Sequence, residues 1–238
     1  MMLELHPSRG IGGALVKLWG GGNYPMTLIN RTAITPNYLR LHFSASELLA
    51  ERSLHPTMWV RGWFPEGERS HQRGYTLINP DLTNSTVDID FAMHDGIAAR
   101  WASAAQPGDI LNVTVLGSKF AIPEPAPAGY VMVGDSASLP AINSLLDAIG
   151  DTPARVFLEA VHDDDRELPT VRDDVVWVDR EDGGASLVKA VEAAAFEASD
   201  HYGWVASDSQ TTRAVARVLQ EQYKISRKWI TARAYWVV

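Results

Sequence analysis

The sequence predicts a protein of two domains, an antiparallel β-barrel followed by an α/β domain with a parallel sheet. Three observations support this fold class. Residues 26–115 form short strand patterns separated by turns, whereas residues 130–238 alternate strands with helices. Between them, prolines at alternate positions of Pro123-Glu124-Pro125-Ala126-Pro127 disfavour helix and strand ladder and favour an extended connector. We therefore place the domains at residues 1–124 and 125–238.

The composition is that of a folded globular protein. The chain has 238 residues, of which 46% are hydrophobic and 21% charged. It contains no run of 18 apolar residues, and its start lacks the pattern of a signal peptide. Cysteine is absent, so disulfides and thiolate metal sites are excluded. These features predict a cytoplasmic protein without membrane insertion, and the net charge of −8 argues against nucleic acid as a partner.

The first domain is expected to contain six antiparallel strands and one short helix. The clearest strand alternates Val87, Ile89 and Phe91 with Asp88 and Asp90. The expected strands cover residues 28–33, 39–43, 58–64, 75–78, 87–93 and 110–115, and the helix covers residues 97–105 with Asp95 as its N-cap. Six short strands with one helix predict a small closed barrel. Residues 1–26, which are rich in glycine, are expected to be an irregular N-terminal extension.

The second domain has the alternating order of a parallel sheet covered by helices on both faces. Strands are expected over residues 130–133, 155–161, 175–178, 202–206 and 229–238, with helices over residues 139–149, 186–198 and 211–223. Sheets of this kind bind their ligands beyond the carboxyl ends of the strands.

The hexapeptide Arg73-Gly74-Tyr75-Thr76-Leu77-Ile78 holds a fixed cation, an aromatic face and a hydroxyl within four residues. On a strand, Arg73 and Tyr75 share one face and Thr76 takes the other. A guanidinium so placed can hold a phosphate by two hydrogen bonds while the phenol ring packs against a planar ring system. The alternative is a hairpin arm with a surface arginine and a half-buried tyrosine.

Two turns from a strand into a helix are candidate anion sites, because a helix N-terminus presents free N–H groups and the positive end of the dipole. In His94-Asp95-Gly96-Ile97-Ala98-Ala99-Arg100-Trp101 the small residues would let a pyrophosphate approach the backbone. Gly134-Asp135, before a helix with Pro140 in its first turn, is a candidate phosphate or nicotinamide site. The alternative for the first segment is an ordinary capped helix with His94 on the surface.

Other catalytic classes have no support in the sequence. The seven histidines show no metal-ligand spacing, so no protein-bound metal is expected. No nucleophile elbow is present, which leaves a hydrolase without support.

The segments described above resemble, in order and spacing, the siderophore-interacting proteins, flavin-dependent ferric-siderophore reductases related to the ferredoxin reductases. The flavin motif of this family, Arg-x-Tyr-Thr/Ser-x-Arg, is matched by Arg73, Tyr75 and Thr76. Further family blocks are matched by Asp90, Phe91, His94, Gly96, Trp101 and Ala102, by Pro107-Gly108-Asp109, and by Gly134, Asp135, Leu139, Pro140, Ala141 and Ile142. The later matches are Trp177 to Arg180, Trp204 to Asp208 with Arg213, and Tyr235-Trp236.

The resemblance implies a ferredoxin-reductase-like fold, with a FAD-binding barrel followed by a domain like those that bind NAD(P)H. By resemblance, FAD would be held by Arg73, Tyr75, Thr76, Asp90, His94, Gly96, Ala98, Ala99 and Trp101. The reductant would approach Gly134, Asp135 and Asp208. The reduced flavin would pass electrons singly to a ferric siderophore, and because hard oxygen donors hold ferrous ion weakly, iron would be released. NADH, NADPH and ferredoxin stay open as electron sources.

An anionic ferric siderophore calls for a locally basic pocket, for which Lys119, Arg227, Lys228 and Arg233 are the candidates; each is otherwise a solvated surface charge. The chemistry belongs to the flavin, so no catalytic side chain is assigned.

The sequence also departs from the family pattern. Ile78 replaces the second arginine of the flavin motif, Ile97 replaces a proline, Ser136-Ala137-Ser138 replaces Glu-Thr-Ala, and Ser207-Asp208 replaces Gly-Glu. These departures keep two alternatives open. One is a siderophore- or flavin-binding module without turnover, and the other is a general flavin or ferredoxin oxidoreductase.

Overall fold

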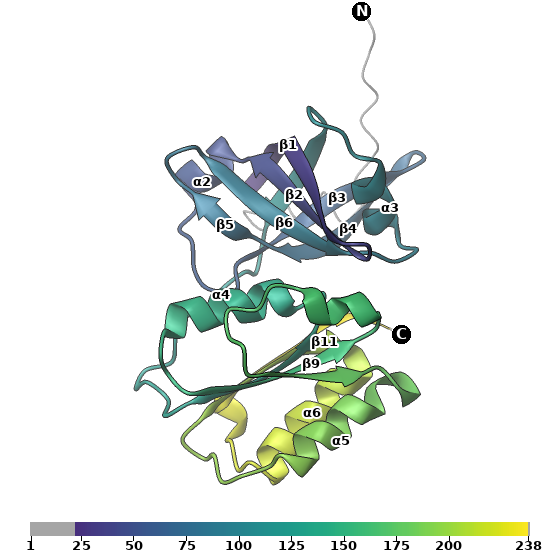
Figure 1. Ribbon diagram of the computed structural model, residues 1–238. Coiled ribbons are helices and arrows are strands. Elements are labelled where there is room, and N and C mark those ends of the chain that lie inside the picture. The colour runs from purple at the N-terminus through teal and green to yellow at the C-terminus, as the bar shows by residue number, and fades with distance from the viewer. Residues whose placement is uncertain (1–21, 238) are drawn as a thin grey trace, which may run out of the picture. The chain divides into compact units, whose positions relative to one another are not determined.

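The computed structural model describes residues 22–237, which divide into two compact units with their boundary between Phe120 and Ala121 (Figure 1). Most of the expected N-terminal extension lies outside the described residues. Its last residues, from Gly22 onward, are not irregular as expected but begin the first strand, because they pair with the strand that starts at Ile110.

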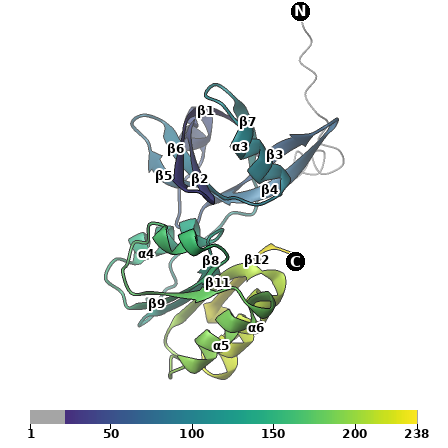
Figure 2. The ribbon, with the colours of Figure 1, turned by 45° about the vertical axis from the view of Figure 1, so that its right-hand side comes forward.

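Within residues 22–120 the first unit forms a seven-stranded antiparallel sheet in the order β4-β3-β7-β1-β2-β6-β5. The elements are β1 (Gly22–Thr35), β2 (Tyr38–Ser44), α2 (Ser46–Glu51), β3 (Trp59–Glu66), β4 (Arg69–Thr76), β5 (Ile78–Asp81), β6 (Thr86–Ala92), α3 (Ile97–Ala104) and β7 (Ile110–Val115). The sheet curls on itself, as Figure 2 shows.

The two edge strands of this sheet, β4 and β5, are consecutive in the chain. Leu77 lies between them, and its N–H donates to the carbonyl oxygen of Met58 over 2.8 Å. One bent segment therefore pairs with β3 along its first half and with β6 along its second. The predicted antiparallel β domain is confirmed as a curled half-barrel. It is not closed as expected, because no ladder within residues 22–120 joins its edge strands β4 and β5, and the strand count exceeds six because this segment is divided at Leu77.

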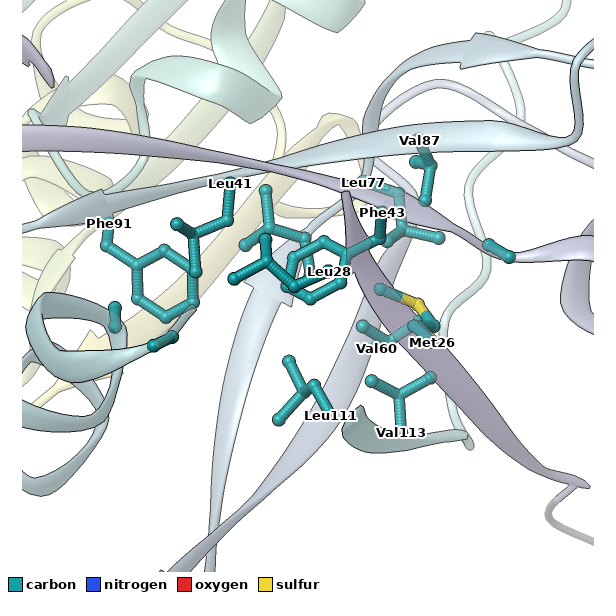
Figure 3. Close-up of a cluster of buried hydrophobic side chains, with 14 of the residues drawn as sticks. Met26, Leu28, Leu41, Phe43, Val60, Leu77, Val87, Phe91, Leu111 and Val113 are labelled. Carbon is teal, nitrogen blue, oxygen red and sulfur yellow. The ribbon is translucent and has the colours of Figure 1, made fainter. Parts of the chain in front are cut away.

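The core of the first unit lies on the inner face of the curled sheet (Figure 3). Met26 and Leu28 of β1 meet Leu41 and Phe43 of β2, and all four are at most 1% exposed. Alternate residues of each strand point inward, so the hydrophobic alternation of the sequence becomes one continuous apolar cluster.

Within residues 121–237 the second unit contains a five-stranded parallel sheet in the order β10-β9-β8-β11-β12, which confirms the predicted α/β class. Figure 1 shows α4 on one face of this sheet and α5 with α6 on the other. The elements are β8 (Tyr130–Asp135), α4 (Leu139–Ile149), β9 (Ala154–Ala160), η1 (Asp163–Glu167), β10 (Val175–Asp179), η2 (Asp182–Gly184), α5 (Ala185–Ala193), β11 (Tyr202–Asp208), α6 (Ser209–Glu221), η3 (Arg227–Trp229) and β12 (Ile230–Trp236).

The direction in which strands are added to the second sheet reverses between β8 and β11. From β8 the chain adds β9 and β10 on one side, and then adds β11 and β12 on the other. This reversal is the switch point at which open α/β sheets bind their ligands.

Two helices differ from the sequence expectation. Helix α5 ends at Ala193 rather than at residue 198, because the N–H of Ala198 donates to the carbonyl oxygen of Tyr223 over 2.9 Å. The segment after Ala193 therefore packs against the end of α6 instead of continuing the helix. Helix α6 begins at Ser209, earlier than expected, since the side chain of Asp208 caps it. Among the described residues, no helix has the length and apolar character needed to cross a membrane.

Candidate functional site

The hairpin of β3 and β4 carries the Arg-Gly-Tyr-Thr motif. Tyr75 lies on the inner face, where its ring is 4.3 Å from that of Phe91 and 5.7 Å from that of Phe64, measured between centroids. Burial raises the pKa of the Tyr75 hydroxyl well above its usual range, more than the neighbouring Arg73 lowers it. The ring is thus a fixed, neutral aromatic surface that is still partly exposed at one side.

Arg73 lies on the same face as Tyr75 and is exposed. Its guanidinium donates to the carbonyl oxygen of Gln72 over 2.8 Å, and no carboxylate among residues 22–237 forms an ion pair with it. An exposed guanidinium without an acidic partner remains available for the phosphate that the sequence assigned to it.

Thr76 points to the opposite face of the hairpin, where it pairs across the ladder with Trp59. Its side-chain oxygen is buried and has no hydrogen-bond partner within residues 22–237. A buried hydroxyl without a partner costs free energy, and such an atom in a native protein calls for an explanation.

On this same face, three more buried atoms have no hydrogen-bond partner within the described part of the chain. They are the indole Nε1 of Trp59, the Nε of Arg61 and the Nε2 of Gln72. The guanidinium of Arg61 stacks over the Trp59 ring at 5.3 Å, and its Nη1 donates to Oε1 of Gln72 over 3.3 Å. We call Trp59, Arg61, Gln72 and Thr76 the hairpin face. It offers three N–H groups and one hydroxyl, which suits a ligand rich in acceptor oxygens.

Sequence reasoning did not select Trp59, Arg61 or Gln72. The available signal was the alternation of Trp59, Arg61 and Trp63 with the apolar Val60 and Phe64, which places a cation between two indoles on one side of a strand.

The second part of the predicted cofactor site is the start of α3. The N-cap is Gly96 rather than Asp95, because the Asp95 carboxylate instead accepts from Arg100 Nη1 over 3.0 Å. No side chain among residues 22–237 caps this helix. A Cβ atom at Gly96 would lie 2.1 Å from Cε1 of His94, so the glycine lets the imidazole fold over the helix start.

The remaining predicted residues of this helix are partly or fully buried. Ala98 and Ala99 are buried beneath the first turn, and Trp101 packs edge-on against Phe64 with 5.5 Å between ring centroids. Phe64 also contacts Tyr75, so one aromatic cluster connects α3 with β4. This cluster therefore holds the start of α3 against the strand that carries the Arg-Gly-Tyr-Thr motif.

Asp90 holds an internal ion pair. Its two carboxylate oxygens accept from Nε and Nη2 of Arg40 over 2.7 and 2.8 Å. Burial raises the pKa of Asp90 more than the hydrogen bonds from Arg40 lower it. Both oxygens are bonded to Arg40 of the neighbouring strand β2, so the contacts give Asp90 a role in the sheet and not the direct cofactor contact that the sequence predicted.

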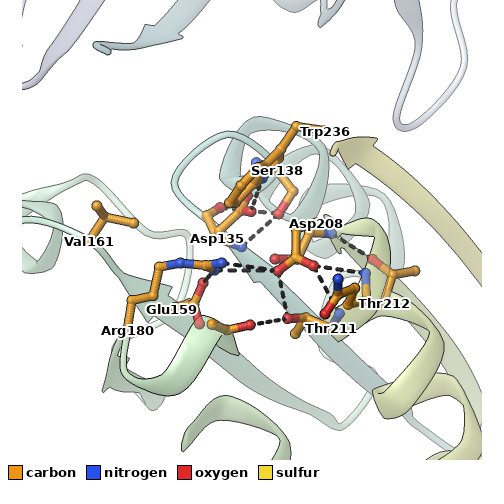
Figure 4. Close-up of polar contacts among 12 residues, drawn as sticks. Asp135, Ser138, Glu159, Val161, Arg180, Asp208, Thr211, Thr212 and Trp236 are labelled. Carbon is orange, nitrogen blue, oxygen red and sulfur yellow. Dashed lines mark hydrogen bonds and ion pairs between the residues drawn. The ribbon is translucent and has the colours of Figure 1, made fainter. Parts of the chain in front are cut away.

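At the carboxyl edge of the second sheet, Asp135, Glu159, Arg180, Asp208 and Trp236 form what we call the carboxylate cluster (Figure 4). They come from the ends of β8, β9, β11 and β12 and from the residue after β10. Arg180 binds Glu159 Oε2 and lies 3.4 Å from Asp208 Oδ2, and its guanidinium stacks over Trp236 at 4.8 Å. The indole Nε1 of Trp236 donates to Asp135 Oδ2 over 2.9 Å.

The three carboxylates of this cluster have different pKa values. Burial raises the pKa of Asp135 and of Glu159, and in each case the hydrogen bonds they accept offset only part of the rise. Burial also acts to raise the pKa of Asp208, but hydrogen bonds from Thr211 and Gln210 and the charge of Arg180 lower it on balance. Asp208 is therefore the strongest acid of the three.

Gly134 completes this edge. A Cβ atom there would lie 2.1 Å from Oγ of Ser138 and 3.1 Å from the carbonyl oxygen of Ala206. Only glycine allows the turn into α4 to close this tightly.

The four basic residues predicted for the substrate are divided between the two units, with Lys119 in the first and Arg227, Lys228 and Arg233 in the second. Lys119 is exposed and follows Ser118, whose hydroxyl accepts from the N–H of Trp59 on the hairpin face. Arg227 and Lys228 lie in η3, before β12, and Arg233 is exposed within that strand. Because β12 extends over seven residues, η3 is roughly 20 Å from the carboxylate cluster, at the opposite edge of the sheet.

The fold and the hairpin together define a class, the ferredoxin-reductase-like flavoproteins. A ferredoxin NADP+ reductase from Neisseria gonorrhoeae, solved with FAD and NADP, superposes with a TM-score of 0.67 at 13% identity, over 90% of this chain and 99% of that chain. The siderophore-interacting protein SipS from Aeromonas hydrophila superposes with a TM-score of 0.78 at 21% identity, over 91% and 92%. At these identities the likeness concerns the fold.

The particular family follows from sequence comparison. Residues 30–116 match the siderophore-interacting FAD-binding domain, and residues 127–237 match the siderophore-interacting protein model. The NADPH-dependent ferric-chelate reductase of Escherichia coli K12 is 30% identical over 196 residues, covering 76% of this chain and 72% of that protein. The chain belongs to the siderophore-interacting protein family.

A longer relative matches the chain as well. The mycobactin import ATP-binding/permease protein IrtA of Mycolicibacterium smegmatis is 35% identical over 239 residues. That match covers 96% of this chain and 27% of IrtA, so the chain spans about a quarter of the length of this relative.

Proposed function

We propose that this chain binds FAD and uses the reduced flavin to convert a ferric siderophore into free ferrous iron, with NAD(P)H or ferredoxin as the electron source. In this proposal residues 1–124 are the FAD-binding domain and residues 125–238 the reductant-side domain. The proposed location is the cytoplasm, where these electron carriers are available. The observation that carries the proposal is the unpartnered Thr76 hydroxyl at the end of a strand that also presents Tyr75.

The residues of the first unit fit the parts of FAD. Tyr75, fixed by Phe91 and Phe64, offers a neutral aromatic surface to a planar ring system. The Thr76 hydroxyl can hydrogen-bond the polar edge of that ring. Arg73 and the uncapped N-terminus of α3, beside His94, can hold two phosphates. When bound, FAD supplies the ability to accept two electrons and release them one at a time.

The other three residues of the hairpin face, Trp59, Arg61 and Gln72, supply the substrate contacts in this proposal. Arg61 is a cation whose Nε lacks a partner, and Trp59 and Gln72 add two further unpartnered N–H groups. A ferric chelate surrounded by negatively charged oxygens would be held there by charge and by hydrogen bonds. One electron reduces Fe(III) to Fe(II), and the lower charge weakens the hold of the hard oxygen donors on the metal.

The first test is an absorbance spectrum of the purified protein and identification of any released chromophore. Flavin bands near about 370 and 450 nm and FAD on release support the proposal. The protein is then reduced with dithionite and mixed with a ferric chelate, and the rate of flavin oxidation is compared with that of free reduced FAD. A protein that refuses FAD, or one that transfers electrons more slowly than free flavin, contradicts reductase activity and favours a binding module.

The substrate side of the proposal is tested with Arg61→Gln. Arg69→Gln is the matched control, because Arg69 starts β4 at the other end of the same hairpin and is exposed. We expect Arg61→Gln to lower the affinity for an anionic ferric chelate about tenfold, with a smaller effect on a neutral chelate. Equal losses for both chelates, or equal effects of both variants, would contradict a charge-based contact at Arg61.

A further inference from the structure

The switch point between β8 and β11 is where this fold class places a nucleotide, with the phosphates at a helix N-terminus. Two helices start there, α4 and α6. Whether a pyridine dinucleotide fits this chain therefore depends on the N–H groups and charges that these two helix starts leave available.

The start of α6 is occupied by the chain's own carboxylate. Oδ1 of Asp208 accepts from the N–H groups of Gln210 and Thr211 over 2.8 and 3.0 Å. Its Oδ2 accepts from the Thr211 hydroxyl over 2.6 Å. Asp208 is fully buried, and its lowered pKa keeps it ionised at neutral pH. A phosphate at this position would meet a negative charge and donors that are already bonded.

The start of α4 also has few N–H groups left for a phosphate. Pro140 has no N–H, and the N–H of Ala141 donates to the carbonyl oxygen of Ser138 over 3.0 Å. The N–H of Ser138 itself donates to Oδ1 of Asp135 over 3.0 Å. Among the first-turn residues of α4, Leu139 is then the one whose N–H has no hydrogen-bond acceptor within the described residues. The buried Asp135 precedes it in the same turn.

The charges of the carboxylate cluster point the same way. Three buried carboxyl groups face one cation, Arg180, whose guanidinium is bonded to Glu159, lies near Asp208 and is covered by Trp236 (Figure 4). Among the described residues at this edge, Oε1 of Glu159 and Oγ of Ser207 are buried without a hydrogen-bond partner. The carboxylate oxygen is an acceptor, so it attracts a donor or a proton and repels a phosphate oxygen, and Ser207 adds a single neutral hydroxyl.

From these contacts we infer that the carboxyl edge of the second unit does not hold the pyrophosphate of a pyridine dinucleotide. A nicotinamide donor is consequently expected to act here without contacts from this edge to its pyrophosphate, so neither NADPH nor NADH gains affinity from that group. The inference rests on the proposed function in that the group being reduced is FAD. It sets this chain apart from the Escherichia coli relative, whose name describes that protein as NADPH-dependent.

The test uses the full chain loaded with FAD, under anaerobic conditions, with flavin absorbance followed in a stopped-flow instrument. Four donors are compared: NADPH, NADH, reduced nicotinamide mononucleotide and 1-benzyl-1,4-dihydronicotinamide, which has no phosphate. Each rate is divided by the rate of the same donor with free FAD. We expect the four ratios to agree within about threefold and to stay linear in donor concentration, since uniform ground-state binding is absent. Saturation by either dinucleotide, with about a tenfold advantage over the mononucleotide, would overturn the inference.

A second readout does not depend on turnover. Isothermal titration of the apoprotein and of the FAD-loaded protein with NADP+ and with NAD+, which both carry the pyrophosphate, should give no binding heat, and binding of either compound would contradict the inference. Failure of the proposed function looks different, because a protein that does not take up FAD, or does not reduce ferric chelates after dithionite treatment, still gives a clear titration result.

Discussion

Replacement of Thr76 by valine tests two effects of the unpartnered hydroxyl, one on the stability of the apoprotein and one on its affinity for FAD. Valine has nearly the shape of threonine without the hydroxyl, whose oxygen is buried and unbonded in the structure. A buried polar group left unsatisfied costs about 1 to 3 kcal/mol, so the apoprotein should become more stable by about 1 kcal/mol or more. In the FAD complex the same hydroxyl would be bonded, so the gain should disappear. The difference predicts FAD affinity lowered about tenfold, which corresponds to ~1.4 kcal/mol.

The assay combines urea unfolding of the apoprotein with fluorescence titration of FAD. Thr35→Val is the matched control, because the Thr35 oxygen is also buried without a partner but lies at the end of β1, outside the proposed site. This variant should stabilise the apoprotein and leave FAD affinity unchanged. The reasoning is refuted if Thr76→Val destabilises the apoprotein, or if both variants change FAD affinity equally.

Three further predictions concern stability and the start of α3. Burial raises the pKa of Glu159, so the protonated carboxyl favours the folded state. This contribution to stability is complete below the unfolded pKa of about 4.3 and is lost as pH rises through the pKa of the folded state. The stability of the wild type relative to Glu159→Gln, from urea unfolding at several pH values, should therefore fall as pH rises; a constant difference would contradict this. Gly96→Ala should weaken FAD binding because its Cβ meets the His94 ring, and titration should show partial recovery when His94→Ala is added. Asp90→Asn should destabilise the protein by ~2 kcal/mol. Breaking a fully buried ion pair costs ~3 to 5 kcal/mol, and the loss is smaller here because Arg40 is 26% exposed. An unchanged urea midpoint would count against this prediction.

Much of the fold followed from the sequence because its signals are local. The alternation of Val87, Ile89 and Phe91 predicts an inward-facing strand wherever that strand pairs. The helix α2, by contrast, was missed. It spans six residues, Ser46–Glu51, and buries one of them deeply, so it is too short to show a period. The division of a predicted strand at Leu77 also depends on which neighbours its two halves find.

The candidate site was predictable only where its residues are close in sequence. Arg73, Tyr75 and Thr76 fall within one strand, so their faces follow from alternation. Trp59 joins Thr76 only through the pairing register of β3 with β4, which the sequence does not reveal. The carboxylate cluster requires strand ends from across the second sheet. The pairing of Asp208 with Arg180, and of Asp135 with Trp236, could not be predicted before the register was known.

The bent segment Arg69–Asp81 has a mechanical consequence. It forms both edges of the first sheet, and β5 is registered with β6 at two positions, Ile78 with Asp88 and Asp81 with Thr86. Together with the pairing of β3 and β7, which is also registered at two positions, this seam is where the sheet opens with few broken ladder bonds. A ligand that contacts Tyr75 and Thr76 fastens the seam, so its release and the opening of the barrel become coupled motions. Amide hydrogen exchange in β5 and β6 would then report ligand occupancy directly, with the apoprotein exchanging first along this line.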